Sequence, residues 1–194
     1  NADLISFWPS FNLAAKSQVF VPLCGKSLDM LWLVQQGFKV VGIELSVTAV
    51  EQFFAELQMD FQRETINQMV RYYNENITIW VGDIFDLDCP LIYPVDAIYD
   101  RAALIALPAS LRPLYVKQCL RVLKPGGVIL LKTLAYDGEG QGPPYSVTAD
   151  EVEQLYGAGK TITNLKTTAR LLQEQDSLLT GEPLIASDSL WSIT

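Results

Sequence analysis

Short apolar runs that alternate with helix-like segments are the feature of this 194-residue sequence that most constrains its fold. The strand-like runs lie at residues 19–23, 39–45, 77–81, 97–99 and 128–134. After the second run, apolar residues recur with the period of an amphipathic helix, at Val50, Phe53, Phe54 and Leu57. Strands that alternate with helices predict an α/β fold, in which helices cover both faces of a mostly parallel sheet.

The C-terminal part of the chain departs from this alternation. Two strands are expected near residues 161–168 and 190–194, and they predict an antiparallel hairpin at the sheet edge, which gives a seven-stranded sheet. Between residues 58 and 76 we expect an excursion or a short hairpin. Thr148 and Glu151 have the spacing of a capping box, so a helix should begin there and run through Tyr156. The length suits a single domain over residues 1–194.

Charge and missing residue types exclude several functions. With 14 basic and 22 acidic residues the net charge is −8, which repels phosphate backbones and anionic lipid, so we expect a small-molecule partner and no nucleic acid or membrane. The chain has no histidine, which removes histidine-assisted nucleophiles, histidine-bound zinc and a histidine general base. Cys24, Cys89 and Cys119 are too far apart for a metal site, and no acidic cluster suggests one. Unpaired cysteines fit a reducing cytoplasm.

The ends of the strands are where a ligand should bind in such a sheet. Gly25 follows the first strand and would let the backbone approach a ligand, although it could equally form an ordinary turn. A single glycine lacks the pyrophosphate cradle of dinucleotide enzymes, which disfavours a nicotinamide oxidoreductase. Glu44 ends the second strand, nineteen residues past Gly25, where an acidic side chain can accept both ribose hydroxyls of a nucleoside. A solvated carboxylate at a strand end is the alternative.

Asp83 follows the third strand and could accept from the exocyclic amine of an adenine, with Ile84 covering the ring. Asp83 could equally cap a turn. Asp100, at the end of the fourth strand, is a candidate proton acceptor, although its position also suits a structural role.

Residues 19–30 resemble the signature of the thiopurine S-methyltransferase family. The resemblance continues in order through residues 40–46, 83–87, 99–104 and 142–147, and it covers most of the chain up to about Tyr156. It implies a Rossmann-like class I methyltransferase fold with S-adenosyl-L-methionine as cofactor. It also implies that the cofactor contacts are Leu23, Glu44, Asp83, Ile84 and Arg101.

The same resemblance places Arg101 toward the substrate, where a guanidinium can stabilise a thiolate; a salt bridge to a carboxylate such as Asp100 is the alternative. Pro143, Pro144 and Tyr145 resemble the Pro-Pro-aromatic motif of amine methyltransferases. They follow the fifth strand, however, and lack the preceding Asn or Asp, so we interpret them as a rigid loop that contacts the substrate.

The function implied by the resemblance is methyl transfer to the sulfur of thiopurines or other small aromatic or heterocyclic thiols. We expect the protein to be a cytoplasmic monomer. A thiolate is a strong nucleophile near neutral pH, so positioning could replace a general base. Small selenium, tellurium or alkyl-thiol compounds are alternative acceptors. A second hypothesis is that the chain is a catalytically silent domain that binds S-adenosylmethionine. Family members carry an N-terminal lid over the site, and this sequence is expected to begin just after it.

Overall fold

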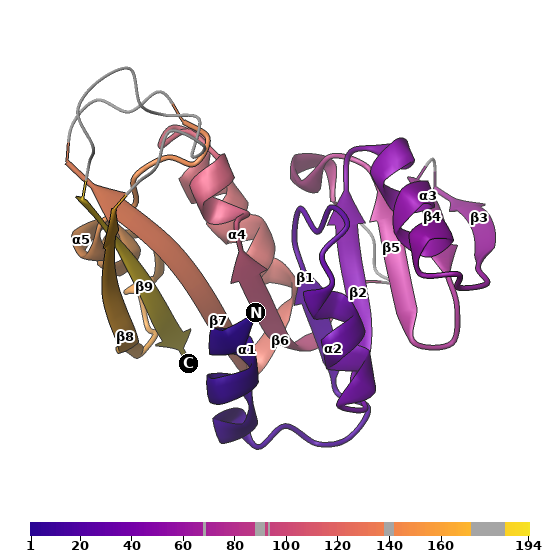
Figure 1. The fold of residues 1–194 in the computed structure, drawn as a ribbon, viewed down its shortest axis with the longest axis horizontal. Helices are drawn as coiled ribbons and strands as arrows, with labels where there is room; N and C mark the ends of the chain where they lie inside the picture. Colours follow the sequence, from indigo (N-terminus) through magenta and orange to yellow (C-terminus); the bar gives the residue numbers. More distant parts are fainter. Residues whose placement is uncertain (68, 88–91, 93, 138–141, 172–184) are drawn as a thin grey trace. The chain divides into compact units, whose positions relative to one another are not determined.

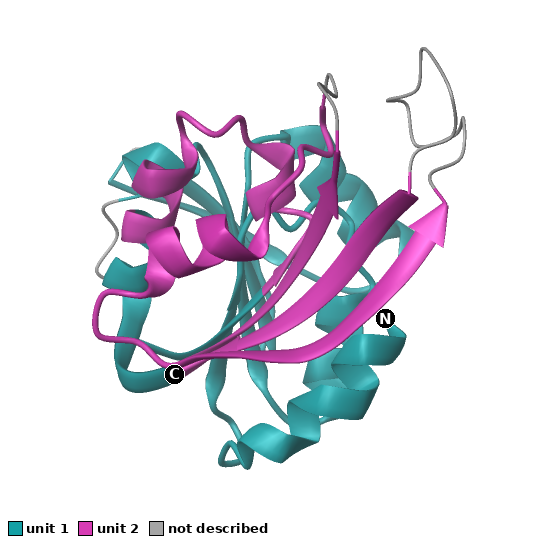
Figure 2. Cartoon of the chain, turned by 90° about the vertical axis from the view of Figure 1, so that its left-hand side faces the viewer, with its two compact units in different colours: residues 1–99, 118–127 teal, residues 100–117, 128–194 magenta. Residues whose placement is uncertain are grey.

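The computed structural model describes residues 1–67, 69–87, 92, 94–137, 142–171 and 185–194 (Figure 1). The chain forms two compact units (Figure 2). Unit 1 comprises residues 1–99 and 118–127, and unit 2 comprises residues 100–117 and 128–194. The single domain inferred from the sequence stays a prediction.

Unit 1 is built on parallel strands that match the apolar runs of the sequence. Its elements are α1 (Ala2–Phe7), η1 (Trp8–Phe11), β1 (Gln18–Val21), α2 (Asp29–Gln35), β2 (Lys39–Glu44), α3 (Val47–Glu56), β3 (Gln62–Ile66), β4 (Met69–Tyr73), β5 (Ile77–Val81), η2 (Ile84–Asp86) and most of β6 (Val95–Arg101). The strand order is β3-β4-β5-β2-β1-β6, and β5, β2, β1 and β6 are parallel.

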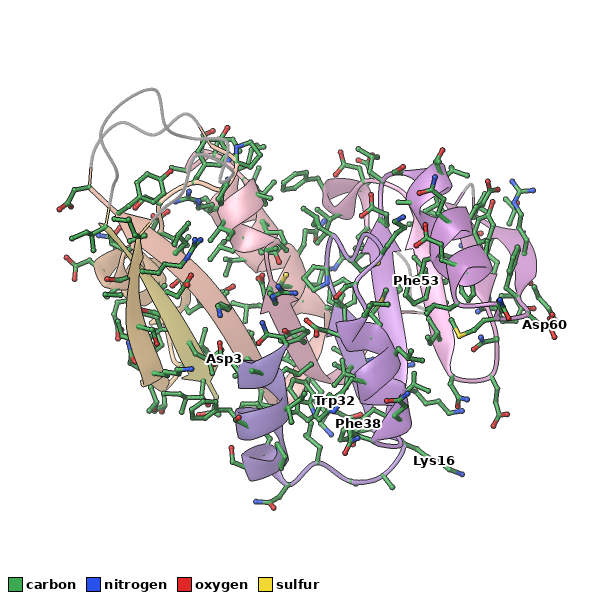
Figure 3. All side chains as sticks on the ribbon, in the orientation of Figure 1. Asp3, Lys16, Trp32, Phe38, Phe53 and Asp60 are labelled. Carbon is green, nitrogen blue, oxygen red and sulfur yellow. The ribbon has the colours of Figure 1, made fainter. Side chains whose placement is uncertain are left out.

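The core of unit 1 follows from these strands being buried on both faces, which favours continuous apolar runs over alternation. Every residue of β1 after Gln18 is buried, and so are the four central residues of β2. The helices α2 and α3 pack against β2. Phe53 on α3 and Phe38, just before β2, contribute buried aromatic rings (Figure 3).

The sequence-based strand count was too low, because the described part of the chain contains nine strands rather than seven. The two additional strands, β3 and β4, form an antiparallel hairpin within residues 58–76 and pair with β5. The sheet is therefore more mixed than predicted. Side-chain contacts hold the hairpin: Arg71 donates to Glu64 across the two strands at 2.6 Å, and the Phe61 ring contacts Phe54 and Tyr72.

Unit 2 shares β6, α4 and β7 with unit 1 and also contains the C-terminal strands. Its elements are η3 (Leu104–Ala106), the first part of α4 (Arg112–Val122), β7 (Leu123–Tyr136) from residue 128, α5 (Ala149–Tyr156), β8 (Ile162–Leu171) and β9 (Ile185–Ile193). Its strands are antiparallel in the order β7-β9-β8, which confirms the C-terminal hairpin with β8 on the outer edge.

The predicted capping box at the start of α5 is half correct. The Thr148 side chain accepts a hydrogen bond from the Glu151 N–H at 3.3 Å, as expected. The Glu151 carboxylate, by contrast, pairs with Arg112. The helix nevertheless begins and ends where the sequence predicted.

Candidate functional site

The loop after β1 is a tight turn that presents its backbone toward the end of β2. Leu23 and Gly25 both have left-handed backbone conformations, with φ of 45° and 49°. The Cys24 N–H donates to the Ile43 carbonyl at 3.0 Å, which ties the loop to the neighbouring strand. The Ser27 hydroxyl accepts from the N–H of Asp29, the first residue of α2, at 3.3 Å.

Glu44 is held in place at the end of β2 by two backbone groups. Its Oε2 accepts the Gly25 N–H at 2.9 Å, and its Oε1 accepts the Ser46 N–H at 2.8 Å. Each carboxylate oxygen has two acceptor positions, so one position on each remains for a further donor. A half-buried carboxylate oriented in this way fits the two hydroxyls of a ribose.

Close packing beneath the loop sets the distance between Gly25 and Glu44. The Cys24 side chain is buried against Gly42, where an added Cβ would lie 2.7 Å from the Cys24 sulfur. Burial, and then the charge of Glu44, raises the pKa of the Cys24 thiol, so this cysteine serves in packing rather than as a nucleophile. Gly42 is the positioning residue that the sequence analysis missed; a glycine inside an apolar strand run is the signal that could have revealed it.

Asp83 and Ile84 lie at the next strand end, because Glu44 is paired in register with Val81 of β5. The Asp83 carboxylate is exposed and caps η2, accepting the Phe85 N–H at 3.0 Å. It thus performs the capping role that was the alternative to adenine recognition, and its second oxygen can still accept a donor. Ile84 is only 4% exposed, so little of its side chain is available to cover a ring.

Within unit 2, Asp100 is a buried carboxylate that organises the chain after it. It is 1% exposed, and it accepts the Tyr115 hydroxyl at 2.6 Å and the Leu104 N–H at 3.2 Å. Burial raises the pKa of Asp100 from 3.8 to about 6, although the hydrogen bonds act to lower it. Arg101, the next residue, is exposed, and Ala102 after it has φ of 70°. The left-handed conformation of Ala102 turns the backbone directly after Arg101, the residue predicted to face the substrate.

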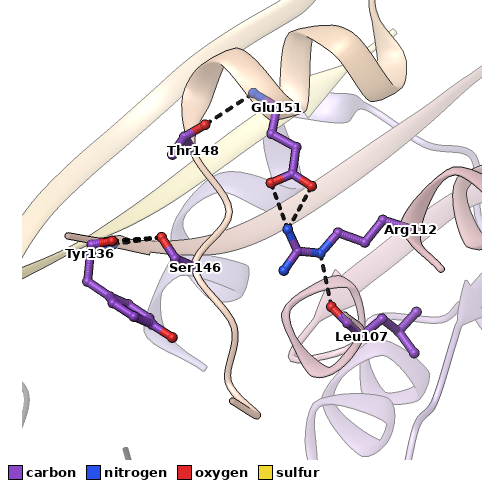
Figure 4. Close-up of polar contacts among 6 residues, drawn as sticks. All are labelled: Leu107, Arg112, Tyr136, Ser146, Thr148 and Glu151. Atoms are coloured by element: carbon purple, nitrogen blue, oxygen red, sulfur yellow. Dashed lines mark hydrogen bonds and ion pairs between the residues drawn. The ribbon is translucent and has the colours of Figure 1, made fainter. Parts of the chain in front are cut away.

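The Pro143-Pro144-Tyr145 loop is fixed along the end of β7. The Tyr136 hydroxyl donates to the Pro144 carbonyl at 2.9 Å, and Ser146 bonds both the N–H and the carbonyl of Tyr136 at 3.0 Å (Figure 4). The Tyr145 N–H donates to the Ile105 carbonyl of η3 at 2.6 Å. These bonds agree with the interpretation of a rigid loop, while its contact with substrate stays a prediction.

Two kinds of feature are absent from the described residues. No group of three or more Cys, Asp or Glu side chains in this part of the chain could hold a metal ion. No helix within the described ranges is long and apolar enough to cross a membrane.

The arrangement of the strands matches that of known methyltransferases. A methyltransferase from Methanosarcina mazei that depends on S-adenosylmethionine superposes with a TM-score of 0.65 at 17% identity, covering 96% of both chains. The YcgJ protein from Bacillus subtilis superposes with a TM-score of 0.73 at 12% identity, covering 99% of this chain and 97% of its own. The fold is that of class I methyltransferases that use S-adenosylmethionine.

Sequence comparison places the chain more narrowly. The model of the thiopurine S-methyltransferase family matches residues 1–190. A thiopurine S-methyltransferase from Legionella pneumophila is 52% identical over 194 residues, which are all of this chain and 88% of the relative. One from Shewanella woodyi is 48% identical over 157 residues, covering 78% of this chain and 70% of the relative. The chain belongs to the thiopurine S-methyltransferase family, which confirms the resemblance and implies S-adenosylmethionine as the methyl donor.

Proposed function

We propose that this methyltransferase transfers the methyl group of S-adenosylmethionine to the sulfur of thiopurines or other small aromatic or heterocyclic thiols. The observation that carries the proposal is the placement of Glu44, whose carboxylate is fixed by the Gly25 and Ser46 amides at the end of β2. The Glu44 geometry bears on the cofactor alone, and the thiol acceptor is proposed from family membership. Leu23 and Asp83 complete the proposed cofactor contacts of unit 1, and Ile84 would add only the small part of its side chain that is exposed.

Methyl transfer to a thiolate requires mainly that the protein bind and orient the cofactor and the acceptor. The bound cofactor supplies an electrophilic methyl group on a sulfonium, and a thiolate is already a strong nucleophile near neutral pH. Glu44 would hold the sugar, and the exposed guanidinium of Arg101 would stabilise the thiolate of the acceptor. Residues 143–145 would contact the acceptor. The net charge of −8 supports a small-molecule acceptor over a nucleic acid.

Titration calorimetry with S-adenosylhomocysteine tests the cofactor assignment without requiring the correct acceptor. Glu44→Ala should weaken binding by about 1.5–3 kcal/mol, the value of hydrogen bonds to a charged group. Glu56→Ala is the matched control, since Glu56 lies on the same unit but its carboxylate pairs with Lys26 on the surface. Unchanged affinity in the Glu44 variant would show that the ribose is held elsewhere.

Initial rates with different acceptors test the substrate class. Turnover of mercaptopurine and thiophenols by the wild-type chain is the expected result. Turnover of alkyl thiols or reduced selenium compounds in their place would assign the chain to the alternative acceptors. Tight binding of S-adenosylhomocysteine with no turnover of any thiol would contradict the proposal in favour of a silent cofactor-binding domain.

A further inference from the structure

The chain segment from Asp100 to Leu107 is held at both of its ends by α4. At the first end, the Tyr115 hydroxyl donates to the Asp100 carboxylate at 2.6 Å. At the second end, the Arg112 Nε donates to the Leu107 carbonyl at 3.0 Å. Residues three apart lie on the same face of a helix, so a single face of α4 spans this segment, which includes Arg101.

Arg112 also holds the start of α5. Its Nη1 lies 2.6 Å from both carboxylate oxygens of Glu151 (Figure 4). Arg112 is 2% exposed, and the Glu151 side chain is 25% exposed. Charged hydrogen bonds that are removed from water are short and strongly directional, so this guanidinium fixes both of its partners.

Together with the backbone, these hydrogen bonds form a closed circuit within unit 2. The Ile105 carbonyl of η3 accepts the Tyr145 N–H at 2.6 Å. From Tyr145 the backbone runs directly into α5 and Glu151, whose carboxylate meets Arg112, and Arg112 returns to Leu107, two residues beyond Ile105. A displacement of either segment would have to break the Tyr145 bond or a bond of the guanidinium.

We propose that Arg112 and Glu151 are positioning residues for methyl transfer, setting the 100–107 segment against the 142–148 loop. The inference rests on the proposed function, which assigns Arg101 and residues 143–145 to the acceptor. Neither Arg112 nor Glu151 needs to touch substrate; the pair acts through the two segments that it joins. A lysine at position 112 could not replace the planar guanidinium, because one ammonium does not present two donors along fixed, diverging directions.

The test uses two variants and a matched structural control. Glu151→Gln keeps the shape of the side chain and removes its charge. Arg112→Lys keeps the charge and removes the two diverging N–H donors of the guanidinium. Because Glu151 is partly exposed, its variant remains informative if Arg112→Lys fails to fold. The control is Thr133→Val, which removes the buried hydrogen bond from the Trp191 indole in the same unit and leaves the bonds of Arg112, Glu151 and Tyr145 in place.

Each protein is measured for melting temperature, for affinity toward S-adenosylhomocysteine, and for kcat and KM with mercaptopurine. We expect both variants to raise the KM for mercaptopurine about tenfold, because small misplacements of substrate-binding groups are costly. Affinity for S-adenosylhomocysteine should change less than about threefold, because Glu44 and its neighbours are untouched. Thr133→Val should lower the melting temperature and leave KM unchanged. Variants that, like the control, lose only melting temperature would overturn the inference.

Amide hydrogen exchange separates failure of this inference from failure of the proposed function. If the wild-type chain does not methylate mercaptopurine, the proposed acceptor is wrong. The exchange rate of the Tyr145 amide still reports whether the contacts that join the two segments are intact. Its exchange should be about tenfold faster in Glu151→Gln than in the wild type, whereas Thr133→Val should leave it unchanged. Equal exchange at Tyr145 in the wild type and Glu151→Gln would overturn the positioning role whatever the substrate.

Discussion

Replacement of Asp100 by asparagine should change how the stability of the protein depends on pH. The carboxyl is buried, and burial raises its pKa from 3.8 to about 6. The folded protein therefore binds this proton more tightly than the unfolded chain does. The stability that the protonated carboxyl provides is fully present below the unfolded pKa, and it is lost as the pH rises through the folded pKa. Asparagine cannot ionise, so the variant should lack this loss.

The size of the effect follows from the difference between the two pKa values. Each pKa unit corresponds to about 1.4 kcal/mol, so full ionisation of Asp100 costs the folded state roughly 3 kcal/mol. Roughly half of this loss, about 1.5 kcal/mol, falls between about pH 5 and about pH 8. The range should begin near pH 5, because the isoelectric point of about 4.5 favours precipitation at lower pH.

Urea denaturation across this range measures the free energy of unfolding of the wild type and of Asp100→Asn. The stability of the variant relative to the wild type should increase by about 1.5 kcal/mol from the acidic to the alkaline end. Tyr115→Phe should have the opposite effect, because it removes a hydrogen bond that lowers the pKa of Asp100, and its stability should fall more steeply with pH. Parallel curves for Asp100→Asn and the wild type would refute the assignment of a raised pKa.

Two further substitutions test one residue in each unit. Arg101→Ala should lower kcat/KM with mercaptopurine roughly ten- to a hundredfold, the value of a hydrogen bond to a charged group, with a smaller change in affinity for S-adenosylhomocysteine by calorimetry. Equal losses in both would leave Arg101 with a cofactor role alone. Gly42→Ala should cost about 1–3 kcal/mol in urea denaturation, because the new methyl group would overlap the Cys24 sulfur. The cost should shrink in a Cys24→Ala background, and an undiminished cost would contradict the proposed clash.

The sequence predicted the parallel strands because their signal is local. Residues such as Val19 and Phe20 lie in strands buried on both faces, so uninterrupted apolar runs identify them. The same runs locate the strand ends, and thereby Glu44 and Asp83. The hairpin strand β3 is polar and largely exposed, with the sequence QRETI, and carries no such signal. Its place in the sheet depends on pairing with β4 and on the Phe61 ring contacts.

Long-range partners explain the remaining differences between sequence and structure. The spacing of Thr148 and Glu151 predicts a local capping box, but the carboxylate finds a stronger partner in Arg112, 39 residues away. A buried guanidinium offers a charged hydrogen bond, whereas the backbone N–H of a cap is a neutral donor. Likewise, the need for a glycine at position 42 depends on where the Cys24 side chain lies, and spacing along the chain does not encode that position.

Two carboxylates near strand ends show how environment separates residues that look alike in the sequence. Glu44 is half-buried, and both of its oxygens bond backbone amides while keeping acceptor positions directed elsewhere. Asp100 is almost fully buried, and its oxygens accept hydrogen bonds from the Tyr115 hydroxyl and from the N–H groups that begin η3. Glu44 therefore keeps acceptor positions that a ligand could use, whereas Asp100 fixes the backbone that carries Arg101. If the acceptor is a thiolate, as proposed, it needs no base, and Asp100 could act through that backbone alone; a role as proton acceptor stays a prediction.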